Sequence, residues 1–598
     1  MNKTKFLALV LVLAMVLTFG VAGCGDTAAV SSAPAASAET AEETAAPTAA
    51  APTENVVALD SSEEGTAGQT VAVTVADPME AMAEEFISYP LEGDNTISIW
   101  YYIPMYVDFM DSNFNYNAVS ASEEATGVKL DFVEVPSSSA DTNFSLMVAG
   151  GDMPDLIPCL EYYVGTMASA YEEDIILDIG EYIDEYMPNY AAVMDCLPEA
   201  TVKDTLTDGH TLAFYRIADG SYSGNGLVTR KDWIEGMDWK WSGNTVSLDE
   251  FTEYLQAVKE KYNPTYPIYM TDGTVGIQAA FDSEIPTLVG DGFMTSVTSA
   301  IFRYDDEVTS GWITDGYREY IEWARDMMDK GIMTSDFLSL DSDRMVQNTM
   351  QASGDIAVWQ SNADKLEEIV DTYGSEYPEL AVCGMPRVTK DPAEQYVWND
   401  EVALVSTRSG FSLSSSCQQP ELVCQWQNYF WTTDGYYMSN YGVEGESYHM
   451  DGETPVFDWD LPVTVTGRNA PNAEMAQQLF TMARFVGSYV DNDMLLATFP
   501  DSALEAVELW TVPDSICGRA YPSAVSGSFT VEESEKIAEY EGDLLTYTAE
   551  HCLNFLTGAT ELNDETWNEY VSTCESMGIN EIIKVYQDAY DQYLAGER

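Results

Sequence analysis

The stretch Thr96-Ile97-Ser98-Ile99-Trp100, together with residues 117–135 (NAVSASEEATGVKLDFVEV), decides the fold class of this chain. The first five residues alternate polar and apolar side chains, which predicts a β-strand. Residues 117–135 begin with a helical pattern, pass through a glycine that suits a helix C-cap, and end in a second alternating strand. A further helix and the apolar pair Leu156-Ile157 follow. This order predicts β-α-β units in an open α/β sheet, in which the loops after the strands face the ligand crevice.

The N-terminus carries an export signal. Two lysines within residues 1–5 precede the apolar stretch Phe6–Phe19, and the small residues Val21-Ala22-Gly23 lead to Cys24. We identify residues 1–23 as a lipoprotein signal peptide whose removal leaves Cys24 as a lipid-modified N-terminus. The apolar run of about 14 residues is shorter than the roughly 20 that a spanning helix needs. The protein is therefore expected at the cell membrane, lipid-anchored on the extracellular face.

Composition divides the remainder into a linker and a folded part. Residues 24–90 are rich in Ala, Thr, Ser, Glu and Pro and poor in aromatic residues, so we expect a disordered linker. Residues 91–598 hold nearly all of the 13 Trp and 36 Tyr. About 500 residues can bury a large core, and at the usual ~100–200 residues per domain they predict two or three lobes.

The net charge is strongly negative, with 100 acidic against 25 basic side chains and a formal value of −75. Such a surface repels nucleic acids, and no cluster of Lys and Arg with interleaved aromatic residues is visible, so no nucleic-acid partner is expected. Polyanionic glycans are disfavoured for the same reason, unless one local basic pocket reverses the potential. The acidity is consistent with solubility in a cation-rich exterior.

The cysteines, histidines and acidic clusters do not predict a cofactor. The cysteines after Cys24 are Cys159, Cys196, Cys383, Cys417, Cys424, Cys517, Cys552 and Cys574. None has a C-x-x-C spacing, and disulfides and buried free thiols both stay open. His210, His449 and His551 are far apart in sequence and are expected to be structural. The acidic residues 305–307 and 491–493 do not continue into a full calcium-binding loop, so we expect solvated faces, with a structural Ca²⁺ left open.

Several motifs of the chain resemble those of family 1 extracellular solute-binding proteins. In chain order they are Glu124–Val128, Val148–Asp155, Asp208–Phe214, Leu227–Trp233, Gly354–Trp359, Thr433–Tyr436, Asn440–Gly445 and Tyr586–Tyr590. The last three are most like the large lipoprotein branch of low-GC Gram-positive bacteria, whose members usually serve oligosaccharide importers. The resemblance covers residue 94 to the C-terminus, and it departs from the family at residues 239–244, which replace a short Pro-Thr link.

This resemblance implies a type II periplasmic-binding-protein-like α/β fold of two hinge-connected lobes. The first lobe is expected at residues 91–216 and 382–436, and the second at residues 226–381 and 437–598. In such a fold the lobes close because one ligand contacts both of them.

The resemblance also places candidate ligand-binding residues in loops at the ends of predicted strands. A pyranose ring stacks its C–H face on an aromatic ring, and polar side chains bind its hydroxyls. In the first lobe the candidates are Trp100, Tyr101, Tyr102, Glu161, Tyr162 and Tyr163. In the second lobe they are Trp359, Gln360, Asn362, Arg519 and Tyr521, with Glu444 and Tyr448 near a crossing between lobes. Asp152 and Asp155 are better suited to turns and helix caps.

The expected function is that of a monomeric, lipid-anchored receptor that captures an oligosaccharide and delivers it to the permease subunits of an ABC importer. We find no serine-elbow, zinc-protease, phosphate-loop or dinucleotide motif, so no enzyme is expected. Two alternatives stay open. The same fold could bind a peptide or another non-sugar solute, and a secreted glycan-active enzyme could use a carboxylate pair that has no sequence signature.

Overall fold

In the computed structural model, β1 (Asn95–Ile103) lies inside a six-stranded sheet with the order β15-β4-β12-β3-β1-β2. β2 (Val128–Pro136) and β3 (Leu156–Ile157) both pair parallel with β1. α3 (Asn117–Thr126) connects β1 to β2, and α4 (Ala140–Gly150) connects β2 to β3. The β-α-β units predicted from the sequence are confirmed, because the alternation of each strand and its helix is a local property of the chain.

The structure describes residues 77–595 apart from short gaps. The gaps are residues 104–111, 113–116, 199–200, 203, 208, 219–221, 270–276, 286–295, 305, 335–343, 393–404, 453, 459–472 and 512–520.

The other half of this sheet is built from segments far apart in the sequence. β12 (Val405–Leu413) pairs antiparallel with β3 and with β4 (Phe214–Ala218), and β15 (Ser488–Val490) pairs parallel with β4. The helices of this part are α2 (Pro78–Met82), α5 (Cys159–Tyr162), α6 (Met167–Glu172), α7 (Gly180–Tyr186), α8 (Pro188–Met194), α16 (Pro420–Tyr429), α17 (Thr433–Asn440) and α18 (Ala473–Phe480). They enclose a hydrophobic core whose largest fully buried side chains include Trp100, Phe144, Trp426 and Trp431.

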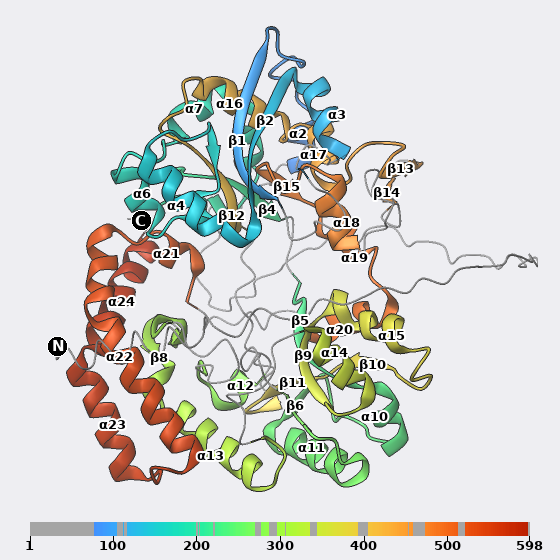
Figure 1. Cartoon of the computed structure of the whole chain (residues 1–598), viewed down its shortest axis with the longest axis vertical. Coiled ribbons are helices and arrows are strands. Elements are labelled where there is room, and N and C mark those ends of the chain that lie inside the picture. The colour runs from blue at the N-terminus through green and yellow to red at the C-terminus, as the bar shows by residue number, and fades with distance from the viewer. Residues whose placement is uncertain are drawn as a thin grey trace, which may run out of the picture. The chain divides into compact units, whose positions relative to one another are not determined.

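A second core forms around a smaller sheet. β5 (Asn225–Arg230) lies between β10 (Val382–Gly384) and β9 (Val358–Asn362) and is antiparallel to both. β6 (Thr245–Ser247) pairs parallel with β11 (Arg387–Thr389). The helices here are α10 (Lys231–Met237), α11 (Leu248–Tyr262), α12 (Gln278–Phe281), α13 (Asp315–Asp329), α14 (Arg344–Ser353), α15 (Leu366–Tyr373), α20 (Asp501–Trp510), α21 (Ser523–Gly527), α22 (Val531–Thr557), α23 (Asp564–Met577) and α24 (Ile579–Ala595). Figure 1 shows these elements along the chain.

The two cores define two lobes. We call residues 78–218 and 405–490 the first lobe and residues 225–389 and 501–595 the second, because their buried side chains belong to separate clusters. The chain passes between the clusters after β4, between β11 and β12, and after β15. This division corrects the expected boundaries at 382 and 437. β10 pairs with β5 and stays in the second lobe, whereas residues 437–490 remain in the first lobe because β15 pairs with β4.

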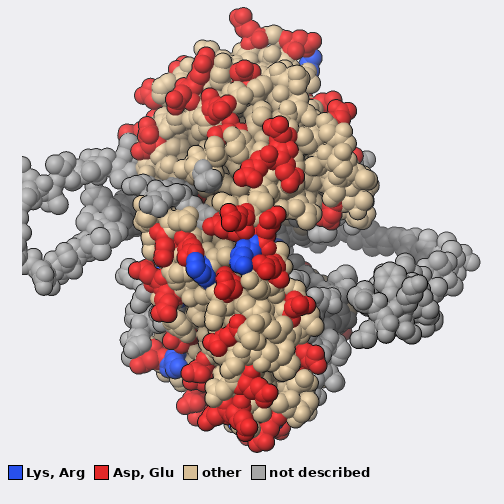
Figure 2. All heavy atoms as spheres, turned by 90° about the vertical axis from the view of Figure 1, so that its left-hand side faces the viewer, with Lys and Arg blue, Asp and Glu red and all other residues tan. Residues whose placement is uncertain are grey.

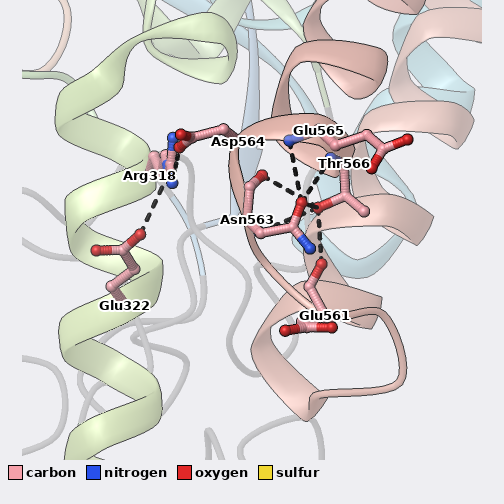
Figure 3. Close-up of polar contacts among 7 residues, drawn as sticks. All are labelled: Arg318, Glu322, Glu561, Asn563, Asp564, Glu565 and Thr566. Carbon is pink, nitrogen blue, oxygen red and sulfur yellow. Dashed lines mark hydrogen bonds and ion pairs between the residues drawn. The ribbon is translucent and has the colours of Figure 1, made fainter.

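The start of α23 is capped locally and linked to α13 by one exposed ion-pair group (Figure 3). At the start of α23, the Asn563 side chain accepts hydrogen bonds from the backbone N–H groups of Glu565 (3.0 Å) and Thr566 (3.1 Å), which is a capping box with Thr566. Arg318 of α13 forms ion pairs with Glu322 (3.2 Å) and with Asp564 of α23 (2.9 Å). Because these carboxylates are exposed, the pairs stabilise the fold only weakly, by about 0–1 kcal/mol each.

The cysteines in the described part of the chain are free thiols. They are Cys159, Cys196, Cys383, Cys417, Cys424, Cys552 and Cys574, and all except the half-buried Cys383 are buried. Loss of hydration raises the pKa of Cys552 and of Cys159 to about 12, so neither is a thiolate near neutral pH. Cys517 lies outside the described residues.

The surface carries the acidity expected from the sequence. Figure 2 shows Asp and Glu side chains spread widely over one face, with few Lys or Arg among them. Among the described residues, no helix combines the length and apolar character needed to cross a membrane.

Candidate functional site

The first lobe contains a pocket of about 330 Å³ at the end of its sheet. Its lining comes from the carboxyl end of β1, from α5 just after β3, from β4 and β12, and from α18 with the segment that leads to β15. The lining residues are Tyr101, Tyr102, Glu161, Arg216, Gly410, Phe411, Gln478, Ala483, Arg484 and Val486. The pocket therefore lies where an open α/β sheet is expected to bind a ligand.

Arg484 is held in a fixed orientation at this pocket. Its Nη2 donates hydrogen bonds to the hydroxyl oxygens of Tyr101 (2.6 Å) and Tyr102 (2.8 Å), and its Nη1 donates to Oε1 of Gln478 (3.1 Å). The guanidinium also lies 5.2 Å from the centre of the Tyr101 ring and 5.6 Å from that of Tyr102. These contacts orient the cation through neutral acceptors and aromatic faces.

Two further charged side chains line the same pocket. Arg216 projects from β4, and burial lowers the pKa of its guanidinium to about 10. Its Nε is buried without a hydrogen-bond partner among the described residues. Glu161 is the acidic residue of the lining, and partial loss of hydration raises the pKa of its carboxyl, although Arg484 acts in the opposite direction. The described lining of the pocket thus includes two arginines and one glutamate.

The second lobe contains a separate pocket of about 230 Å³ at the end of β9. Its lining residues are Val228, Gln347, Asn348, Gln351, Trp359, Gln360, Ser361, Asn362, Lys365, Leu366 and Ile369. Side-chain amides dominate its polar groups. Oε1 of Gln360 is buried and has no hydrogen-bond partner among the described residues. An amide oxygen in that state is available to accept a hydrogen bond from a ligand.

Six of the residues predicted from the sequence line these pockets. Tyr101, Tyr102 and Glu161 line the first pocket, and Trp359, Gln360 and Asn362 line the second. Trp359 is only 4% exposed, so it contributes an edge of its ring to the pocket and packs the rest into the second core.

Three first-lobe candidates around β1 and α5 line neither pocket. Trp100 is 2% exposed, and the rings of Phe144 (5.4 Å between centroids) and Tyr162 (5.5 Å) pack edge-on against it. Trp100 is therefore part of the first core in this structure, and a ligand contact there stays a prediction. Tyr162 belongs to the same aromatic cluster, and the hydroxyl of Tyr163 donates to Oε2 of Glu173 (3.0 Å).

The remaining candidates also lie elsewhere. Tyr448 is buried and stacks on Tyr437 (5.9 Å, 16°), and Glu444 is exposed. Tyr521 donates a hydrogen bond to the carbonyl of Tyr586 (2.8 Å) and packs on the second core. None of these three residues lines either of the two pockets, and their roles as ligand contacts stay predictions. Arg519 and Cys24 lie outside the described residues.

Sequence reasoning missed the basic side chains of the first pocket. Arg216 is a single charge inside the apolar strand Phe214–Ala218, and Arg484 is a single charge between Ala483 and Phe485. In a chain with 25 basic residues, an isolated arginine within an apolar segment was the signal that could have found them. Gln478 and the amides of α14 gave no comparable signal.

Comparison with known proteins identifies the family of this chain. Residues 110–437, more than half of the chain, match the model of the bacterial extracellular solute-binding protein family. The chain belongs to this family. The resemblance found in the sequence is therefore confirmed.

Individual members of the solute-binding family are similar over most of the chain. The fructooligosaccharide ABC transporter substrate-binding protein FusA of Streptococcus pneumoniae is 22% identical over 504 residues, which cover 79% of this chain and 86% of FusA. The structure of FusA in complex with kestose aligns with a TM-score of 0.61 at 19% identity, over 84% of this chain and 100% of FusA. An HMO-binding, ABC-transporter-associated solute-binding protein of Bifidobacterium longum infantis aligns with a TM-score of 0.65 at 17% identity, over 84% of this chain and 99% of that protein. These likenesses confirm the two-lobed α/β fold.

Proposed function

We propose that this protein is an extracellular receptor that binds an oligosaccharide between its two lobes and delivers it to the permease subunits of an ABC importer. One observation carries the proposal: each lobe has its own pocket at the ends of its strands, one with tyrosines and arginines and the other with a tryptophan edge and amides. Hinge bending would bring the two pockets together, and a ligand that contacts both would stabilise this closed state. The oligosaccharide-binding relatives support the sugar as the ligand class.

The lining of both pockets suits a sugar. The half-buried ring of Tyr102 offers aromatic surface for the C–H face of a pyranose, and the amides and guanidinium groups can bind its hydroxyls. We propose that the protein does no chemistry. Glycoside hydrolysis ordinarily uses two carboxylates, and Glu161 is the sole carboxylate among the described residues that line the two pockets.

We also propose that Cys24 anchors the protein, as a monomer, to the outer face of the membrane of a Gram-positive bacterium. In cells fed an alkyne analogue of palmitate, the wild-type protein should take up the label and the Cys24→Ser variant should take up none, because the thioether site is lost. The Cys196→Ser variant is the matched control, since this cysteine is buried in the fold, and it should label like the wild type. Equal labelling of the Cys24→Ser variant would contradict the anchor.

The ligand class is tested with the mature protein, solubilised from membranes in mild detergent. Its melting temperature is measured with a panel of neutral and acidic oligosaccharides and of peptides, and each stabilising compound is recovered and analysed. Ligand at 100 times its dissociation constant should stabilise the protein by about 2.7 kcal/mol. Stabilisation by an intact oligosaccharide supports the proposal. A cleaved product would show an enzyme, and stabilisation by peptides alone would show a peptide receptor.

Gln360→Leu tests the pocket of the second lobe. With the oligosaccharide found in the panel, affinity measured by calorimetry should fall roughly 2- to 10-fold, the loss of one neutral hydrogen bond of about 0.5–1.5 kcal/mol. The melting temperature of the free variant should not fall, because the amide oxygen it loses is buried and unpaired. Gln418→Leu, on the exposed surface of the first lobe, is the control and should bind like the wild type. Unchanged affinity in Gln360→Leu would show that Gln360 does not contact the ligand and would contradict this pocket as part of the binding site.

A further inference from the structure

The first-lobe pocket contains a guanidinium without an acidic partner. No described residue forms a hydrogen bond or an ion pair with the side chain of Arg216, and its Nε is buried. Removing a charged group from water without compensation is unfavourable by several kcal/mol. The position is unusual in this chain, where carboxylates outnumber basic side chains by 100 to 25.

Other arginines of the same chain do have carboxylate partners. Arg230 forms a two-pronged ion pair with Asp232, with N–O distances of 2.8 and 2.7 Å. Arg318 pairs with two carboxylates on the surface. The fold therefore pairs these arginines with its own carboxylates, whereas Arg216 has no such partner among the described residues.

Arg484 extends the same basic region. Its acceptors include the phenol oxygens of Tyr101 and Tyr102 and the amide oxygen of Gln478, which orient the guanidinium at the pocket. Among the described residues of the lining, Glu161 is the acidic one beside these two arginines. A planar guanidinium binds a carboxylate through two parallel hydrogen bonds, more strongly than it binds a hydroxyl.

The pocket of the second lobe has no acidic side chain in its described lining. Its charged residue is Lys365, and its other polar groups are amides and a serine. Across both pockets the lining residues thus include three basic side chains and one acidic one. The balance at the pockets is opposite to that of the whole chain.

We propose that the ligand is an acidic oligosaccharide, and that Arg216 and Arg484 bind the carboxylate of one of its sugar units. The inference rests on the proposed function, because it specifies which sugars the receptor takes. The net charge of −75 does not prevent this binding. Exposed surface carboxylates more than about 8–10 Å away are largely screened at physiological ionic strength, whereas the pocket arginines act at contact distance.

The test compares ligands that differ only in charge. Calorimetry on the mature, detergent-solubilised protein uses oligogalacturonides, oligoalginates and sialylated oligosaccharides, each beside its carboxyl methyl ester and a neutral oligosaccharide of the same length. At least one free acid should bind at least about 10-fold more tightly than its ester, and its affinity should fall as NaCl is raised. Equal affinity of each acid and its ester would overturn the inference.

Two variants assign the effect to the pocket. Arg216→Gln and Arg484→Gln should each weaken binding of the acid by roughly 10- to 100-fold and bring it close to the affinity of the ester, which should change little. The melting temperature of Arg216→Gln should stay the same or rise, since an unpaired buried charge is removed. Arg318→Gln, paired on the surface of the second lobe, is the control and should keep the preference for the acid.

The outcomes separate the inference from the proposed function. Binding of neutral oligosaccharides with no preference for acids would refute the acidic ligand and leave the sugar receptor standing. Absence of binding by every oligosaccharide, acidic or neutral, would refute both. A preference for the acid that survives in both arginine variants would refute the assignment of these two residues.

Discussion

Trp510→Ala should lower the free energy of unfolding by about 3–5 kcal/mol, the usual range for removing a fully buried tryptophan. Trp510 is 0% exposed at the end of α20, and its indole N–H donates to the carbonyl of Met385 (3.0 Å). Its ring lies so close to Gly226 of β5 that a β-carbon there would be 2.5 Å from ring atom Cε2. The side chain therefore joins the C-terminal segment 501–595 to the sheet of the second lobe.

Urea unfolding followed by circular dichroism measures this loss. Trp239→Ala is the matched control, because that ring is only half-buried and should lose less. A change in Trp510→Ala no larger than in the control would mean that the C-terminal segment does not depend on this contact. The same variant should retain the hydrophobic core of the first lobe, which shares no residue with the second.

Asp232→Asn should lower the free energy of unfolding by about 2–4 kcal/mol, because it leaves the buried Arg230 guanidinium without its counterion. The side chains of Arg230 and Asp232 are 8% and 19% exposed. Arg230 also donates to the carbonyls of Gln351 (3.3 Å) and Ala352 (3.2 Å) at the end of α14, next to the second pocket, and packs over Trp233 (5.0 Å). The Arg230–Asp232 pair thus links the end of α14 to β5 and α10.

The control for this prediction is the exposed ion pair of Figure 3. Asp564→Asn removes a partner of Arg318 whose side chain is 88% exposed, and it should lower stability by no more than about 1 kcal/mol. The double variant Arg230→Met, Asp232→Leu should lose less than Asp232→Asn, since no unpaired charge remains. Equal losses in Asp232→Asn and Asp564→Asn would show that burial does not strengthen the first pair.

Residues that line the pockets could be predicted where the alternation of side chains showed a strand and its end. Tyr101 and Tyr102 follow the alternation of β1, and Gln360 and Asn362 follow that of β9, so their positions at the sheet ends were expected and both pairs line pockets. Trp100 and Tyr448, also predicted as ligand contacts, are instead buried against other aromatic rings in this structure. An aromatic side chain has the same sequence pattern whether it contacts a sugar or another aromatic ring. In this structure Phe144 and Tyr162 pack on Trp100, and Tyr437 packs on Tyr448.

The lobe boundaries could not be predicted from the sequence, because they depend on which distant strands pair. β10 joins β5 across about 150 residues, and β15 joins β4 across about 270, pairings that no local pattern encodes. The alternation of side chains within each strand is visible in the sequence, but the strand with which it pairs is not.

The sequence by itself determined the features that depend on neighbouring residues or on composition: the β-α-β units, the export signal as an expectation, the acidity and the family. Only the tertiary structure decided which strands share a sheet and which charges meet. Arg216 and Arg484 are about 270 residues apart, and their common pocket exists because β15 returns to β4. Net charge is a sum over the whole chain, whereas recognition depends on the few groups within contact distance, and folding alone selects those.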